Sequence, residues 1–127
     1  MSSATAQANA EGLPEIDLSE HLLTKGDLAL RSHSELFEIA AILRAAADLM
    51  AYSRYSGLLG EITGTLVSLA RDARDAAETR HPANRTEANW RGWLIVSHAA
   101  YLSESLSDIA VLAAEASAAE RHAPAIR

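Results

Sequence analysis

Two histidine positions offer the only side chains whose type and spacing could do chemistry. His98 falls within an apolar helical stripe, where it could ligate haem or a metal, or change charge with pH. Glu78 and His81 form a Glu-x-x-His unit, the unit that di-iron helical proteins use in pairs together with further carboxylates. No other histidine has a glutamate three residues before it, and His98 has no second histidine on its face. A helical bundle that binds a ligand or a metal through His98 or through Glu78 and His81 is an alternative hypothesis. Because neither site is complete in the sequence, we expect no cofactor.

Catalytic patterns are otherwise missing from the sequence. There is no cysteine, which excludes thiolate nucleophiles, disulfides and cysteine-ligated metals. The sequence has no Gly-x-Ser-x-Gly elbow, no phosphate-binding glycine loop and no His-Glu-x-x-His unit. The acidic residues stand at helix-surface spacing beside arginines, where solvated ion pairs are the usual outcome. We therefore expect a protein that is not an enzyme.

The net charge of −6 is concentrated near the N-terminus. Residues 1–30 carry −4, and the remaining 97 residues carry only −2. This balance argues against direct binding to nucleic acid, which needs a basic surface. An acidic inhibitor that mimics nucleic acid on a basic target is a further alternative. The position of the charge weakens that alternative for the helical body and makes the arm the expected place for electrostatic recognition of a partner, through Glu15, Asp17, Glu20 and Asp27.

Four segments are expected along the chain. Residues 1–14 are small and polar, which predicts a disordered tail. Residues 15–31 form an acidic arm with a short helix, which Asp17 could cap and Gly26 would stop. Residues 32–121 form one helical bundle domain, and residues 122–127 form a C-terminal tail. No apolar run is long enough to span a membrane and no secretory signal is visible, so we expect a cytoplasmic protein.

The main domain is expected to contain three helices. Ser32 and Glu35 have the spacing of a capping box, and apolar residues recur at three and four up to about residue 54. A second apolar stripe runs from Leu59 to the His81-Pro82 pair, which would stop it. A third helix begins at a capping signature at residues 84–87, and its pattern continues without a break to residue 121. The core stripe of this helix is expected to comprise Leu94, Ile95, His98, Leu102, Leu106, Ile109, Leu112, Ala113 and Ala116.

The third helix has a second stripe of mostly small residues nearly opposite its core stripe. A helix that is apolar on two sides requires neighbours on two sides, so this stripe predicts a homodimer or partner interface. Two tryptophans one turn apart could anchor a partner, because tryptophan is frequent in interface hot spots. The predicted interface comprises Trp90, Trp93, Val96, Ala100, Ser107, Val111 and Ala114.

Together these features predict an all-α fold, a three-helix bundle with a short N-terminal helical arm that homodimerisation could complete. The leading functional hypothesis is a small protein–protein interaction module: an adaptor, regulator or inhibitor that acts by binding through its helical surfaces. The excess of arginine over the single lysine and the abundance of alanine are consistent with GC-rich coding in a bacterium or phage.

Overall fold

The structure, a computed structural model, describes residues 24–125, and this part of the chain is helical with connecting turns and no strand. The all-α prediction is therefore confirmed, but the described residues form five helices in place of the expected three main helices and one short helix of the arm. They are α1 (Lys25–Ala29), α2 (His33–Ala51), α3 (Gly60–Thr79), α4 (Arg85–Tyr101) and α5 (Leu106–His122).

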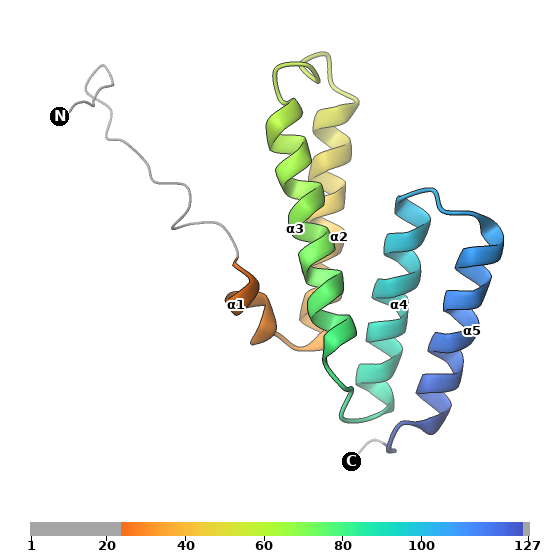
Figure 1. Cartoon of the computed structure of the whole chain (residues 1–127). Coiled ribbons are helices and arrows are strands. Elements are labelled where there is room, and N and C mark those ends of the chain that lie inside the picture. Colours follow the sequence, from red (N-terminus) through yellow and green to blue (C-terminus); the bar gives the residue numbers. More distant parts are fainter. Residues whose placement is uncertain (1–23, 126–127) are drawn as a thin grey trace.

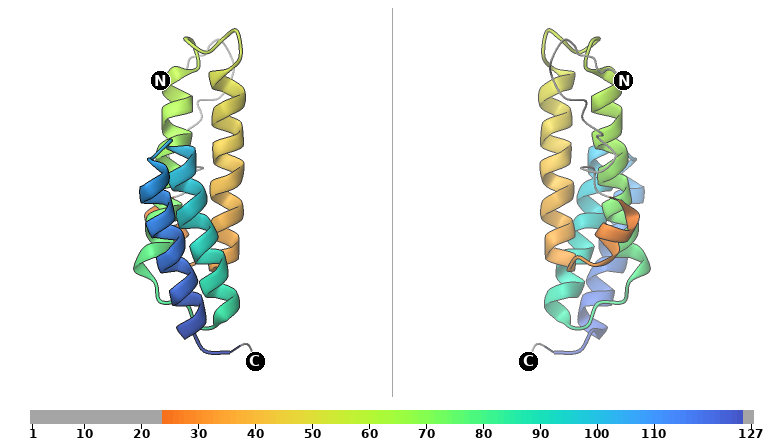
Figure 2. Two further views of the ribbon diagram at one scale, coloured as in Figure 1. Left: turned by 90° about the vertical axis from the view of Figure 1, so that its right-hand side faces the viewer. Right: turned by 90° about the vertical axis from the view of Figure 1, so that its left-hand side faces the viewer.

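The helices form two hairpins that lie side by side (Figure 1). α2 packs along α3, α4 packs on both of them, and α5 packs on α4. α1 contacts α3 on the side away from α4 and α5, as the right-hand view of Figure 2 shows. The turn between α2 and α3, residues 52–59, projects beyond the end of α4 (Figure 1). One end of the α2–α3 hairpin is consequently left without a neighbouring helix.

Side-chain caps fix where four of the helices begin. Ser32 accepts a hydrogen bond from the backbone N–H of Glu35, whose carboxylate accepts one from the Ser32 N–H, so the predicted capping box is confirmed. Thr24 and Asp27 form a second capping box at α1. Asn84 caps α4 and Ser105 caps α5, each through the N–H three residues later. α3 has no side-chain cap and follows directly from the turn.

The core is small and rich in alanine. Leu28, Leu36 and Leu94 are its largest fully buried apolar side chains, and the helices around them meet through alanines. Small side chains at a helix contact allow the helix backbones to approach closely. The alanines of this core are Ala40, Ala70, Ala73 and Ala77.

The prediction of one long helix over residues 84–121 is wrong. The chain turns back after Tyr101, and residues 102–105 connect two antiparallel helices. Ser103 adopts a left-handed backbone conformation with φ of 61°, and Ser105 then caps a new helix. Of the expected core stripe, Leu94, Ile95 and His98 are buried. Beyond the turn no residue of α5 is fully buried, and Leu106 is 85% exposed.

The arm also differs from its prediction. Gly26 lies inside α1 and does not stop it, because α1 begins at Lys25 under the Thr24 cap. The proposed cap at Asp17 and the tail at residues 1–14 lie outside the described residues. At the other end, α5 continues one residue past the expected boundary, and the carbonyl of Pro124 accepts a hydrogen bond from the Arg85 N–H. Within residues 24–125, no helix has the length and apolar character needed to cross a membrane.

Candidate interaction surface

The two tryptophans of the predicted interface face different surroundings. Trp90 is half-buried and packs on Phe37 of α2, with ring centroids 5.2 Å apart, so it belongs to the α2–α4 contact. Trp93 is 57% exposed. It lines a shallow groove of about 230 Å³ between α4 and α5, together with Val96, Ala113 and Ala116. Only Trp93 remains available as an anchor for a partner.

The turn at residues 102–105 divides the second stripe between two helices. Ala100 lies near the end of α4, whereas Ser107, Val111 and Ala114 lie on α5, and all four are exposed. In the groove, α5 covers part of the stripe's α4 half. A Cβ added at Gly92 would lie 2.8 Å from the Ala116 Cβ, so α4 and α5 approach closely here. The stripe therefore supplies an intrachain contact, and homodimerisation stays a prediction.

The acidic arm is described only at its end. The Asp27 carboxylate accepts hydrogen bonds from the backbone N–H and the hydroxyl of Thr24, the N-cap of α1, and these bonds lower the pKa of this exposed carboxyl. Glu15, Asp17 and Glu20 lie outside the described residues. The described residues therefore provide no contact that supports the alternative of a nucleic-acid mimic.

His98 lies at the contact between α2 and α4. Its Nδ1 is 3.5 Å from Nη1 of Arg44, and Nη2 of Arg44 donates to the Ser97 hydroxyl over 3.2 Å. A guanidinium has no acceptor, so Nδ1 must accept and the ring proton resides on Nε2. That Nε2 is buried and has no hydrogen-bond partner among the described residues. Burial, followed by the charges of Arg74, Arg44 and Arg71, lowers the pKa of His98 to about 4.

This arrangement makes His98 a neutral core residue. Arg44 is only 8% exposed, and burial lowers the pKa of its guanidinium as well. The Tyr101 hydroxyl donates to Asp48 at the end of the same contact. Burial and this hydrogen bond raise the pKa of Tyr101. The network aligns α2 with α4.

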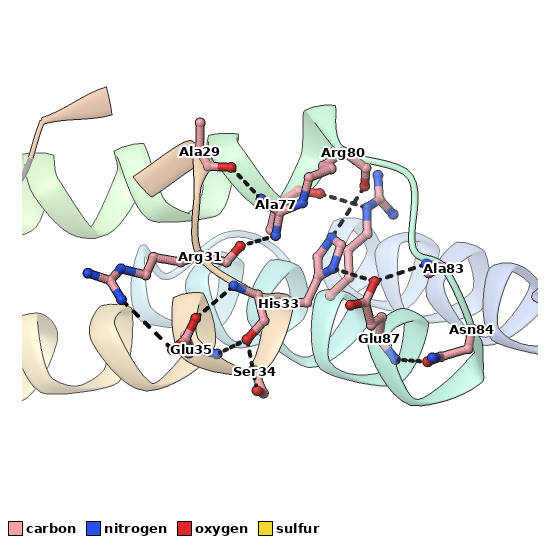
Figure 3. A network of polar contacts seen from close by, with 12 residues as sticks. Ala29, Arg31, His33, Ser34, Glu35, Ala77, Arg80, Ala83, Asn84 and Glu87 are labelled. Carbon is pink, nitrogen blue, oxygen red and sulfur yellow. Dashed lines mark hydrogen bonds and ion pairs between the residues drawn. The ribbon is translucent and has the colours of Figure 1, made fainter. Parts of the chain in front are cut away.

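A second polar network joins the end of α1, the start of α2, the end of α3 and the start of α4 (Figure 3). Arg80 donates to the carbonyls of Ala29 and Arg31, which fixes the end of α1. His33 is fully buried, and its Nε2 lies 3.3 Å from the Arg80 carbonyl. The His33 Nδ1 lies 3.4 Å from the Glu87 carboxylate. These contacts hold α1, α2, α3 and the start of α4 together.

The Glu78–His81 unit is not assembled into a metal centre. Glu78 pairs with Arg74 at 3.6 Å, and His81 is exposed in the loop after α3. In the described part of the chain, no three His, Asp or Glu side chains lie close enough to hold a metal ion. The metal-binding alternative gains no support from this geometry.

An apolar surface that the sequence reasoning missed lies on the α2–α3 hairpin. Phe37, Arg44 and Asp48 of α2 point toward α4, as their partners show. Each helical residue is rotated by about 100° from the last, which places Ile39, Leu43 and Met50 roughly on the opposite side of α2. On α3, Glu78 shares a cleft with Arg91 and Leu112. By the same rotation Ile62 and Leu69 lie on the far side of α3 from that cleft.

We call this surface the outer face. At its centre are Ile39, Leu43, Met50, Ile62 and Leu69, and at its rim are Ile42 and Leu49. Ile42 is 69%, Leu49 77% and Ile62 49% exposed, and the other four are exposed only in part. A signal for it was present in the sequence, because Ile42 and Leu49 are one heptad apart and lie outside the series of apolar residues that recur at three and four along α2.

The chain matches no protein-family model, no curated protein and no solved structure.

Proposed function

We propose that this protein is a small, non-enzymatic protein–protein interaction module that binds its partner through the outer face. The observation that carries the proposal is the exposure of Ile42, Leu49 and Ile62 beside four partly exposed aliphatic side chains of the α2–α3 hairpin, on the side that α4 leaves free. Contiguous exposed apolar surface on a folded protein marks an interaction site more often than scattered single residues do. The second stripe, our interface hypothesis from the sequence, offers less, because α5 covers part of it.

The shape of the outer face favours a helical partner. Aliphatic side chains of α2 lie beside Ile62 and Leu69 of α3, and together they form a surface on which an amphipathic helix can lay its apolar side. The chain beyond residue 30 carries a net charge of only −2, and its charges are interspersed. We therefore expect binding that depends on apolar contact and changes little with salt concentration.

The test compares two surfaces through matched double substitutions. Immobilised full-length protein would capture binders from extracts of the cells that produce it, with quantitative mass spectrometry of the captured proteins. Ile42→Gln with Leu49→Gln alters the outer face, and Leu106→Gln with Val111→Gln alters α5, where both side chains are at least half exposed. We expect the first pair to reduce capture of a specific protein at least tenfold and the second pair to leave it unchanged.

The reverse pattern would overturn this assignment. Loss of capture only with the α5 pair would return the interface to the second stripe. Both variants alter exposed positions, so the free energy of unfolding of each, measured in denaturant, should lie within about 0.5 kcal/mol of that of the unaltered protein. That measurement separates loss of a surface from loss of the fold.

A further inference from the structure

The N-terminal helix α1 lies on the same side of the α2–α3 hairpin as the outer face, where it packs on α3. Its Leu28 is fully buried in the core cluster, against which Ile39 and Leu43 of the outer face also pack. Arg80 holds the other end of this contact by donating to the carbonyls of Ala29 and Arg31. The right-hand view of Figure 2 shows α1 over the lower part of this side of the hairpin. The N-terminal end of α1 therefore lies on the same side of the hairpin as the outer face.

The N-terminal end of α1 points toward the uncovered part of the hairpin. In Figure 1 the first turn of α1 is its end nearer the α2–α3 turn, and the chain passes from its other end into α2. Beyond α1, Ile42, Leu49 and Ile62 of the hairpin are exposed. The described residues leave these three apolar side chains largely uncovered.

The preceding segment has the composition and the length to cover them. Residues 16–23 contain four aliphatic side chains among polar residues: Ile16, Leu18, Leu22 and Leu23. Eight residues span about 12 Å as a helix and up to roughly 28 Å when extended. From Ile39 to Leu49 along α2 is about 15 Å at 1.5 Å per residue. The segment can therefore reach the far end of the outer face while Leu28 stays in place.

We propose that residues 16–23 of the same chain pack on the outer face beside α1, and that a protein partner must displace them to bind. The first part depends only on the described apolar surface and the position of α1. The second part rests on the proposed function of the outer face. The segment then acts as an intramolecular competitor, because it offers the same aliphatic contacts as a partner helix and is tethered next to the site.

A single spin label in the full-length chain tests the position of the segment. The chain has no cysteine, so Glu20→Cys introduces the only site for a nitroxide at a polar position of the segment. We expect the label to reduce the NMR amide signals of residues 42–50 and 62–69 at least twofold and to leave those of residues 106–111 unchanged. Adding Ile16→Ser and Leu22→Ser should abolish the reduction. A label at Ala125→Cys serves as the matched control and should spare the outer face.

Two results would overturn the proposal. Unchanged signals for residues 42–50 and 62–69 would show that the segment does not lie there. A second sample mixes the labelled, NMR-silent chain with isotope-labelled chain that has no cysteine. Signal loss as strong in this mixture as within one chain would show that the segment covers a second copy.

Competition has a separate readout. Ile16→Ser with Leu22→Ser should at least double the capture of proteins whose binding depends on Ile42 and Leu49, and unchanged capture would overturn the competition. Failure of the proposed function is distinguishable from failure of this inference. If Ile42→Gln with Leu49→Gln leaves capture intact, the outer face is not the partner site, although the label can still place the segment on it.

Discussion

His98 and Arg44 place two basic side chains next to each other in the contact between α2 and α4. Arg44 makes no ion pair with a carboxylate within 4 Å in the described part of the chain, and its guanidinium is held by Ser97 and the neutral ring of His98. The arrangement tolerates one positive charge but not two, because both groups are shielded from water. The histidine that the sequence offered as a ligand or switch therefore stabilises the fold in its neutral form.

The depressed pKa of His98 predicts a loss of stability in acid. In the unfolded chain His98 takes up a proton near its ordinary pKa of 6.5, whereas in the folded chain it does so only near 4. The unfolded state binds more protons between these values, so this stabilisation is full above pH 6.5 and is lost as the pH falls toward 4. We expect a loss of about 2 kcal/mol between pH 7.5 and 4.5 that His98→Gln removes. Urea unfolding of both proteins at both pH values measures it, and an equal loss in the two would contradict it.

At the scale of helices, close packing of α4 on α5 depends on one glycine. The Cβ of an alanine at Gly92 would meet the Ala116 Cβ at 2.8 Å, whereas nothing lies within 4 Å of a Cβ at Gly64 of α3. Both glycines lie inside helices, where alanine is intrinsically better by roughly 1 kcal/mol. Overpacking opposes that gain at Gly92 by about 1–3 kcal/mol.

The two alanine substitutions should therefore have opposite signs. We expect Gly64→Ala to raise the free energy of unfolding by roughly 1 kcal/mol and Gly92→Ala to lower it by about the same amount. Thermal or urea unfolding measures both. Stabilisation by Gly92→Ala equal to that by Gly64→Ala would show that α4 and α5 are not in close contact.

Ser103 gives a second prediction at this scale. A left-handed conformation costs a residue with a side chain about 1–2 kcal/mol, and glycine avoids that penalty. We expect Ser103→Gly to stabilise the protein by roughly 0.5–1 kcal/mol after glycine's greater loss of backbone entropy. Ser68→Gly, at an exposed position inside α3, is the control and should destabilise it by about 0.5 kcal/mol. Destabilisation by both substitutions would favour the continuous helix that the sequence pattern suggested.

Caps and apolar spacing were enough to predict the all-α class, the start of α2 at its capping box and the end of α3 before Pro82. The turn after Tyr101 was missed because its apolar pattern continues with the same period on both sides. A capping pair at Ser105 and Asp108 was the available signal. The burial of His98 was predictable from its stripe, but its contact with Arg44, more than fifty positions away, depends on how α2 packs on α4. The outer face likewise depends on which side of the hairpin α4 covers.

At the scale of the whole molecule, we expect the two sides of the α2–α3 hairpin to separate stability from binding. One side of the α2–α3 hairpin packs on α4 and contains the polar network around His98. The other side carries α1 and the exposed aliphatic residues of the outer face. Substitutions at the exposed residues Ile42 and Leu49 should therefore alter binding without altering the fold, and substitutions between α2 and α4 should do the opposite.

Hydrogen exchange of the full-length protein, alone and with a captured partner bound, tests the outer face most directly. Amide protection reports which helices the partner covers or stabilises. We predict slower exchange at residues 39–50 of α2 and 60–69 of α3 in the complex, with α5 unchanged. Slower exchange confined to α5 and the groove it forms with α4 would contradict the assignment of the outer face.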